Sequence, residues 1–437
     1  MKSIKINGYS IFMVFAVAYA ICPVYFILPY ISARDLLVYL LGLLCLYLGL
    51  LKSKFKYHVN SGNKKLIIAI FVWSIITVAI QLYHGELSYA VKQICIWVLV
   101  VAVGYNIINT KKRFLRTIDV LIWVFLIVGI FGIVEEFTQI NIFDVLFNTT
   151  GAELNYNAVR LGVYRIISFT SHAISYCTFC MFGLAIVFYR QTIERKKIHV
   201  VTYCVICINA IFTLSRSSLF VIIACQIILL WLCGYYTFLK KMLKILVVVV
   251  IVGGGLALIS ESIRQVIITA WYIVLAIFDD SYADTLVSMG FTDNAGAIGT
   301  RLKLYGWVLE EVSPNYLLGK GRDAVFSVTV TDGSYSTTKT SIEVEWLQTL
   351  FRYGFIGLIA EIYYYALLMF SCLKRRWKKG ADWEGKLSYP RMMFAVVICY
   401  VAESFAVSQN NELQVFVIML MLLLSYMSNK GFEKKAM

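Results

Sequence analysis

Apolar runs of about twenty residues, the length of one bilayer-spanning helix, recur from one end of this chain to the other. The strands of outer-membrane barrels show short alternating patterns instead. Apolar residues make up 60% of the 437 positions and charged residues 15%, against about half and a quarter in soluble domains. Twelve runs can be delimited: 10–30, 35–51, 65–83, 89–108, 115–138, 168–189, 198–214, 217–238, 242–260, 345–373, 391–408 and 412–428. They predict an all-α polytopic membrane protein in which residues 1–437 form a single integral membrane domain.

Basic residues mark every second connection between these runs. Together with Lys2 and Lys5 they account for 28 of the 40 lysines and arginines, in segments 52–65, 111–116, 190–197, 240–244, 374–391 and 430–435. Positive segments stay in the cytoplasm during insertion. Both termini are therefore predicted to be cytoplasmic, and residues 261–343, between the ninth and tenth runs, external. That loop carries ten acids against six bases, so the net charge of +15 reflects topology and anionic lipid, and not a nucleic-acid partner.

The first apolar run has a second interpretation. Lys2 and Lys5, followed by apolar residues and Ala18-Tyr19-Ala20, are similar to a cleaved signal peptide. The run continues to Tyr30, however, and its removal would put the other eleven spans out of phase with the basic loops. We therefore expect an uncleaved first span.

Among the eleven cysteines, two Cys-x-x-Cys pairs have the spacing of zinc ligands. They are Cys177 with Cys180 and Cys204 with Cys207. Both pairs lie inside apolar runs, where cysteine acts as a small hydrophobic residue. No metal site and no cofactor are predicted.

Two external segments, 139–167 and 261–343, are long enough to carry a function. In the larger one, residues 264–278 are apolar and aromatic and could lie in the membrane interface. A turn-rich stretch follows, and then residues 300–312 have a helical pattern. A polytopic protein with one long external loop near its C-terminus is more typical of chemistry at the membrane surface than of conduction.

Five arginines are placed outside, or at outer helix ends, by this topology. They are Arg160, Arg165, Arg216, Arg301 and Arg322. Arginine suits bidentate binding of phosphate oxygens, so several together would fit a lipid-linked diphosphate. Each could instead reach lipid head groups or cap a helix. Arg216 lies in so short a link between two spans that we expect it to face a protein cavity.

Carboxylates form a second set of candidates. Glu343 and Glu345 stand where the large loop re-enters the membrane, where a carboxylate can serve as a general base. They could equally complement the positive end of the following helix. Glu361 and Glu403 fall inside spans and are either functional or bonded between helices.

Three motifs resemble those of the O-antigen ligase and polymerase family. Thr213–Ser217 reads Thr-Leu-Ser-Arg-Ser and is similar to the family's Ser-Arg turn. Arg301–Gly321 contains Trp307, a proline and Leu-Gly-Lys-Gly, as in the family's Arg…Trp…Pro-Leu-Gly-x-Gly segment. Glu343–Gly357 is similar to the stretch that enters the helix after the loop, with Leu-Gln and then Gly-Phe-Ile-Gly. The resemblance in topology covers nearly the whole chain.

The departures favour one branch of that family. Glu343 stands where the ligases have histidine, and Val344 where they have asparagine. The resemblance then implies a polymerase that joins repeat units carried on undecaprenyl diphosphate, at the outer face of the bacterial cytoplasmic membrane. It implies metal-independent glycosyl transfer, with the growing chain as donor and a hydroxyl of a new lipid-linked unit as acceptor. A chain-length regulator is a possible protein partner of such enzymes.

The resemblance and the residue chemistry together assign roles as hypotheses. Arg216 and Arg301 would neutralise the diphosphate as charge develops, and Glu343 or Glu345 would accept the proton of the acceptor hydroxyl. The remaining candidates bind substrate: Arg160, Arg165, Arg322 and, by stacking on a sugar, Trp307.

Other functions remain open. An O-antigen ligase shares these motifs, and a transporter or flippase of lipid-linked oligosaccharide would also be polytopic and basic inside. A transporter would be expected to show repeated halves, which the sequence lacks. A scaffold of an export complex would tolerate changes in the arginines.

Overall fold

A computed structural model describes most of the chain. The residues described are 8–23, 25–47, 63–148, 159–160, 163–170, 172–236, 298–332, 335–374, 386–405 and 413–428, with single positions at 240 and 272. The predicted ninth span, 242–260, and the expected interfacial stretch, 264–278, lie outside the described residues except for Tyr272.

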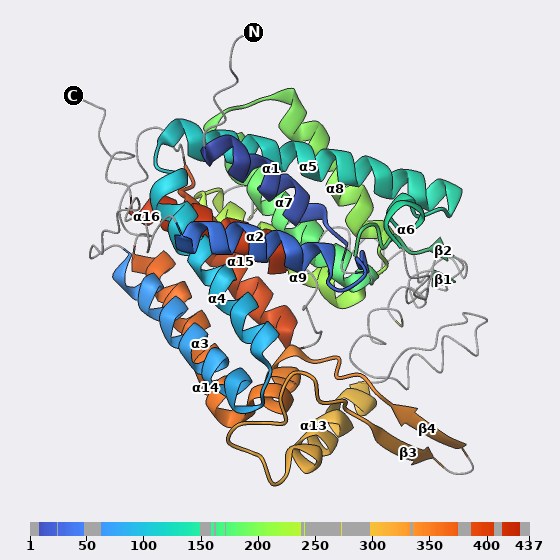
Figure 1. Ribbon diagram of the computed structural model, residues 1–437. Coiled ribbons are helices and arrows are strands. Elements are labelled where there is room, and N and C mark those ends of the chain that lie inside the picture. The colour runs from blue at the N-terminus through green and yellow to red at the C-terminus, as the bar shows by residue number, and fades with distance from the viewer. Residues whose placement is uncertain are drawn as a thin grey trace, which may run out of the picture.

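The described part is a bundle of helices with two small hairpins (Figure 1). The helices are α1 (Gly8–Ile21), α2 (Ala33–Leu46), α3 (Lys64–Tyr83), α4 (Leu87–Ala102) continued by the π-helix η2 (Val103–Ile107), α5 (Lys111–Thr138), α6 (Ile142–Phe147), α7 (Ala173–Ile193), α8 (Lys197–Phe212), α9 (Arg216–Leu232), α13 (Ile298–Val312), α14 (Glu345–Lys374), α15 (Tyr389–Ser404) and α16 (Leu413–Ser428). Each predicted span within the described residues overlaps one of these helices. Five of them, α3, α4 with η2, α5, α7 and α14, are long and apolar enough to cross a membrane, and α1, α8, α9 and α16 are shorter apolar helices. The chain is a polytopic membrane protein.

Two details differ from the sequence prediction. Helix α1 ends at Ile21, nine residues before the predicted end of the first span, because Pro23 and Pro29 interrupt a helix. The external segments are not wholly helical. Strands β1 (Val159–Arg160) and β2 (Val163–Tyr164) pair antiparallel, as do β3 (Val328–Asp332) and β4 (Tyr335–Lys339). The Val-Thr-Val-Thr pattern of β3 suits a strand.

The helix ends that adjoin the basic connections gather at one end of the bundle. Tyr9 at the start of α1 donates to the carbonyl oxygen of Arg113 at the start of α5 at 3.0 Å. Asn63, at the start of α3, donates to Tyr105 at 2.6 Å and to Ser428, the last residue of α16, at 3.1 Å. This grouping agrees with the prediction that every second connection is basic and lies on one side of the membrane, and the end is called the inner end below.

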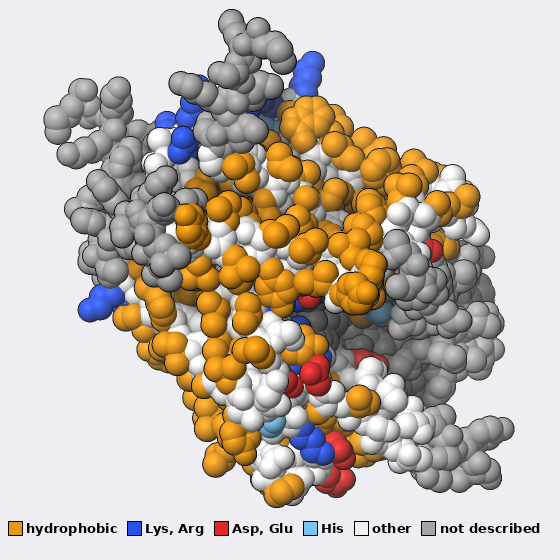
Figure 2. Space-filling view, in the orientation of Figure 1, with side chains coloured by type: hydrophobic (Ala, Val, Ile, Leu, Met, Phe, Trp, Pro, Cys, Tyr) orange, Lys and Arg blue, Asp and Glu red, His pale blue; other side chains and the backbone are white. Residues whose placement is uncertain are grey.

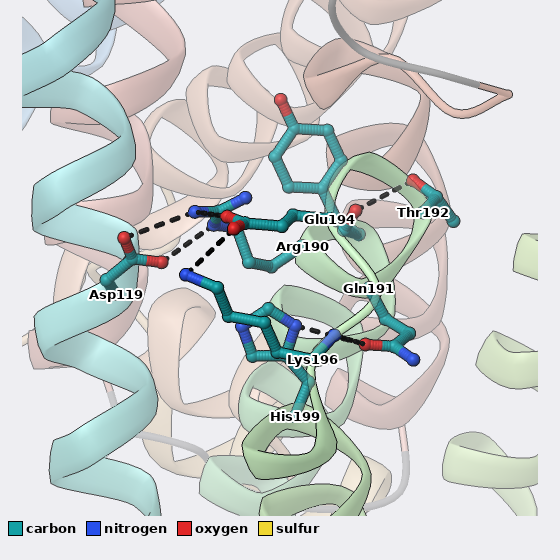
Figure 3. A network of polar contacts seen from close by, with 8 residues as sticks. Asp119, Arg190, Gln191, Thr192, Glu194, Lys196 and His199 are labelled. Atoms are coloured by element: carbon teal, nitrogen blue, oxygen red, sulfur yellow. Dashed lines mark hydrogen bonds and ion pairs between the residues drawn. The ribbon is translucent and has the colours of Figure 1, made fainter.

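Figure 3 shows a charged network at the same inner end. Arg190, near the end of α7, donates from Nε and Nη2 to the two carboxylate oxygens of Asp119 on α5, at 2.7 and 3.2 Å. Nη2 also donates to Glu194 at 2.7 Å, and Lys196 pairs with Glu194 at 2.9 Å. These bonds hold the inner ends of α5, α7 and α8 together.

Helix α7 is the centre of the bundle. In the most apolar 18 residues of this helix, 89% of positions are buried, a larger share than in any other long span described. Phe179 packs on Phe125 of α5 with ring centroids 4.6 Å apart. Asn209 of α8 accepts from Tyr176 at 3.0 Å and donates to the carbonyl oxygen of Gly129 at 2.8 Å. Such interhelical bonds between buried polar groups stabilise helix packing in a membrane.

Helix α14 is broken near its outer end, and the loop that precedes β3 fills the break. Gly354 has φ 64° and ψ −167°, which is not helical. Residues 316–321 replace the lost helical hydrogen bonds, because their backbone pairs with that of residues 351–356. The pairs, amide donor first, are Lys320–Phe351 at 2.8 Å, Gly321–Arg352 at 3.1 Å, Phe355–Tyr316 at 2.8 Å and Ile356–Leu317 at 3.2 Å. Two of the sequence motifs thus form one structural unit, which attaches the external lobe of α13 and the β3–β4 hairpin to the bundle.

Candidate functional site

Charged side chains gather at the outer end of the bundle. Figure 2 shows a mostly apolar face over the helices, as a lipid-facing surface requires, and a hollow between the bundle and the external lobe. Acidic, basic and histidine side chains lie in and around this hollow. Charged groups in a membrane protein usually face a cavity and not lipid, and such a cavity is where they can act on a polar substrate.

The segment that follows α6 is anchored to the bundle by Glu135, near the outer end of α5. The Glu135 side chain is 1% exposed. Its Oε1 accepts from the amide of Ile167 at 3.0 Å and from the Tyr164 hydroxyl at 3.4 Å, and its Oε2 accepts from the amide of Ser168 at 2.9 Å. These bonds determine the path of residues 164–168.

Arg165 lies within this anchored segment and is buried. Its Nε donates to the carbonyl oxygen of Thr213 at 2.8 Å, and the amide of Ile166 donates to the carbonyl oxygen of Phe212 at 3.3 Å. The guanidinium of Arg165 is therefore held at the turn between α8 and α9, directly before the Ser-Arg pair of that turn. The structure thus brings two predicted site segments, 139–167 and 213–217, into contact.

His172 and Glu343 complete the polar arrangement around Arg165. His172 caps α7, with Nδ1 accepting from the amide of Ile174 at 3.1 Å, so the proton of its neutral ring is on Nε2. Burial lowers the pKa of His172 below 6.5, the charge of Arg165 lowers it further, and the carboxylate of Glu343 opposes both. The guanidinium of Arg165 and the carboxylate of Glu343, at the end of the large loop, thus both lie close enough to the His172 ring to interact with it electrostatically.

Glu343 and Glu345 differ in exposure. The Glu343 side chain is exposed, whereas Glu345, the first residue of α14, is half-buried. Between them Val344 is buried, and after them Trp346 packs on Phe405 at 5.2 Å between ring centroids. Glu343 is therefore the more accessible of the two predicted bases.

The two carboxylates predicted inside spans are buried. Glu403 of α15 is 1% exposed and faces Ser218 of α9 and Thr178 of α7. Glu361 of α14 is 6% exposed and lies near Thr349 and Glu345. Neither position decides between a functional and an interhelical structural role.

Three of the predicted arginines have a described backbone but no described side chain. Arg216 is the first residue of α9, after Ser215 as its N-cap. Arg301 lies in the first turn of α13, and Arg160 pairs with Val163 across the β1–β2 hairpin. Their roles remain predictions.

Arg322 and Trp307 belong to the external lobe. Arg322 lies over the ring of Tyr89, 4.7 Å from its centroid, at the outer end of α4. Trp307, in α13, is half-buried and packs against the hydrophobic core. The contacts of Arg322 are thus with the α3–α4 turn and α4, on a different set of helices from those that hold Arg165.

Sequence reasoning missed several polar residues of this region. Glu135 was not singled out, although a carboxylate inside an apolar run is a signal that could have identified it. The same signal applies to Lys92 and Asp35, which form a salt bridge between α4 and α2. In the described part of the chain no group of three metal-binding side chains is found.

Part of the chain that contributes to this region matches a known protein family. Residues 200–362 match the family model described as O-Antigen ligase. The matched segment contains Arg216, Arg301, Arg322, Glu343 and Glu345. The resemblance drawn from the motifs is confirmed for this segment. No curated protein matches the chain.

Proposed function

We propose that this chain, whose residues 200–362 match the family model described as O-Antigen ligase, polymerises undecaprenyl-diphosphate-linked oligosaccharide repeat units. The product would be an O-antigen or capsular polysaccharide, made at the outer face of the bacterial cytoplasmic membrane. Support comes from the family, which acts on lipid-linked polysaccharide, and from the polytopic helical fold. The enzyme would be a glycosyltransferase that uses a lipid diphosphate as leaving group.

The juxtaposition of Glu343, His172 and Arg165 carries the proposal. Glycosyl transfer from a lipid diphosphate needs a base for the acceptor hydroxyl and positive charge for the leaving group. Glu343 is an exposed carboxylate, and both Glu343 and the guanidinium of Arg165 interact electrostatically with His172.

The reaction would proceed as follows. The oxygen of the acceptor hydroxyl forms a bond to the anomeric carbon of the donor chain. The bond from that carbon to the diphosphate oxygen breaks, and its electron pair leaves with the diphosphate. The hydroxyl proton passes to Glu343, and the products are the lengthened chain and free undecaprenyl diphosphate.

The other predicted residues keep the roles assigned from the sequence. Arg216, at the start of α9, and Arg301, at the start of α13, would neutralise the departing diphosphate with Arg165. Arg160 would assist from the β1–β2 hairpin. Glu345 is the second choice of base.

A gel profile of surface polysaccharide tests the proposal. A deletion strain would carry wild type, Arg216→Ala, Glu343→Gln or the control Glu310→Gln, which alters an exposed carboxylate on α13. We expect the first two variants to reduce the ladder to a single repeat unit, with protein still in the membrane, and the control to keep the ladder. An unchanged ladder in both site variants would favour a scaffold.

An O-antigen ligase is the second candidate, favoured by the description of the matching family and by the histidine that lies beside Glu343. In that case, or for a flippase of lipid-linked oligosaccharide, even the single surface repeat unit would be lost. The same gel therefore separates the candidates.

A further inference from the structure

A second polar group lies at the outer ends of α2 and α4, away from the helices that hold Arg165. Lys92 of α4 forms a salt bridge with Asp35 of α2, and the two side chains are only 13% and 22% exposed. Arg34 and Arg322 lie close enough to interact electrostatically with Lys92. These two further positive charges raise the electrostatic cost of burying Lys92, which its carboxylate partner offsets.

The external loop is held over this group by one carboxylate. The amides of Arg322 and Asp323 both donate to Oε1 of Glu86, the latter at 2.9 Å. This approach requires glycine at position 321, because φ is +90° there and a Cβ atom would collide with Glu86. Oε2 of Glu86, on a side chain that is 7% exposed, is buried and accepts no hydrogen bond from the described residues.

The charges of this group are balanced. We define the Lys92 group as Arg34, Asp35, Glu86, Lys92, Arg322 and Asp323, three basic and three acidic side chains. Arg352 and Glu345 flank it and leave the balance unchanged. The aromatic rings of Tyr39 and Tyr89 border the group, since Tyr39 donates to the carbonyl oxygen of Ser88 at 2.9 Å and Tyr89 lies under Arg322.

Balanced charge decides which ligand would suit the group. A diphosphate would meet the carboxylates of Asp35, Glu86 and Asp323 as well as the basic groups, and the repulsion would offset the attraction. A hydroxyl-rich sugar needs both donors and acceptors, and this group supplies both, as guanidinium and ammonium groups and as carboxylates. Aromatic faces beside such groups add apolar contact for the sugar ring.

We propose that the Lys92 group is an oligosaccharide subsite, which holds the sugars of the lipid-linked acceptor while the Arg165 region binds diphosphate. This inference rests on the proposed function and divides the substrate between two places. Glu86 accepts from a sugar hydroxyl through Oε2, and Arg322 and Lys92 donate to sugar oxygens.

Binding experiments on the purified full-length protein in detergent separate the two subsites. One probe is undecaprenyl diphosphate without sugar. The other is the oligosaccharide released by mild acid from the lipid-linked repeat unit of the producing strain. The variants are Arg322→Gln and the isosteric Glu86→Gln, with Lys320→Gln as a control in the same loop, where Lys320 pairs with Glu311 instead. Melting temperature and gel filtration identify any variant that has lost its fold, and Glu86→Gln keeps the test informative if Arg322→Gln does.

We expect both variants to weaken oligosaccharide binding about tenfold, equal to about 1.4 kcal/mol, and to keep undecaprenyl diphosphate affinity within about twofold. The control should bind both probes as wild type does. Weaker diphosphate binding with intact oligosaccharide binding would overturn the inference and assign the group to phosphate. Unchanged binding of both probes would overturn it in favour of a structural role. A wild type that binds undecaprenyl diphosphate alone would refute only the inference, whereas a wild type that binds neither probe would refute the proposed function as well.

Discussion

Replacing Glu135 with glutamine tests whether the anchor at the outer end of α5 positions Arg165. The two carboxylate oxygens of Glu135 accept from two adjacent amides, Ile167 at 3.0 Å and Ser168 at 2.9 Å. Glutamine has one carbonyl oxygen and one NH2 group. One of the two buried amides would therefore face a donor and lose its acceptor.

The expected cost follows from that single lost acceptor. A buried donor left unsatisfied costs about 1–3 kcal/mol, which shifts an equilibrium about fivefold to 150-fold. The cost applies to the ordered path of residues 164–168, and Arg165 lies inside that segment. We therefore expect Glu135→Gln to lower both the melting temperature and the rate of transfer.

The assay is the extension of purified lipid-linked repeat units by purified protein in detergent. We expect the rate with Glu135→Gln to fall at least about fivefold, the lower limit of the estimate above. The control is Glu136→Gln, which changes the neighbouring carboxylate but none of these bonds, and should keep the wild-type rate. Wild-type rate and melting temperature in Glu135→Gln would refute the positioning role.

Three further changes examine other parts of the structure. Gly354→Ala would strain a residue at φ 64° and drive a methyl group into the loop backbone, so the melting temperature should fall by the equivalent of about 1–3 kcal/mol. The control Gly306→Ala, in open space on α13, should be neutral or stabilising. Equal melting temperatures of the two variants would contradict the backbone pairing of residues 316–321 with residues 351–356. Because the folded state lowers the pKa of His172 below 6.5, the unfolded state binds more protons below that pH. Wild-type stability should then fall as pH drops below 6.5, and His172→Gln should show a smaller fall when melting is followed from about pH 7.5 to 5. Arg190→Met removes a buried guanidinium from its partly exposed partners Asp119 and Glu194, and should cost about 1–3 kcal/mol in stability. It should leave the polysaccharide ladder intact, because this network lies at the inner end of the bundle. Loss of the ladder at a normal protein level would contradict this separation of the two ends.

The positions of the helices could be predicted closely from the sequence. Spans such as 65–83 and 115–138 correspond to α3 and α5, because a bilayer requires a continuous apolar run wherever a helix crosses it. The local pattern also predicted the helix at 300–312, and the family resemblance drew attention to the Leu-Gly-Lys-Gly loop that follows. The break in α14 was not predicted, since its glycine is stable there only through the backbone of residues 316–321.

In the candidate site, too, the sequence predicted individual residues but not which of them lie together. The sequence identified Arg165 and Arg322 as members of one set of external arginines, and Glu343 as a separate candidate base. The structure places Arg165 with His172 and Glu343, and Arg322 with Lys92 and its neighbours.

What the sequence by itself determined is the class of protein, its membrane spans, the recurrence of basic residues in every second loop and the match of residues 200–362 to the O-Antigen ligase family model. These properties depend on the composition of short continuous segments. Only the tertiary structure decided which charges meet, because Asp35, Glu86, Lys92 and Arg322 lie up to 287 positions apart in the chain, from 35 to 322. A buried charge depends for its energy on its nearest neighbours in space, and helix packing determines those neighbours.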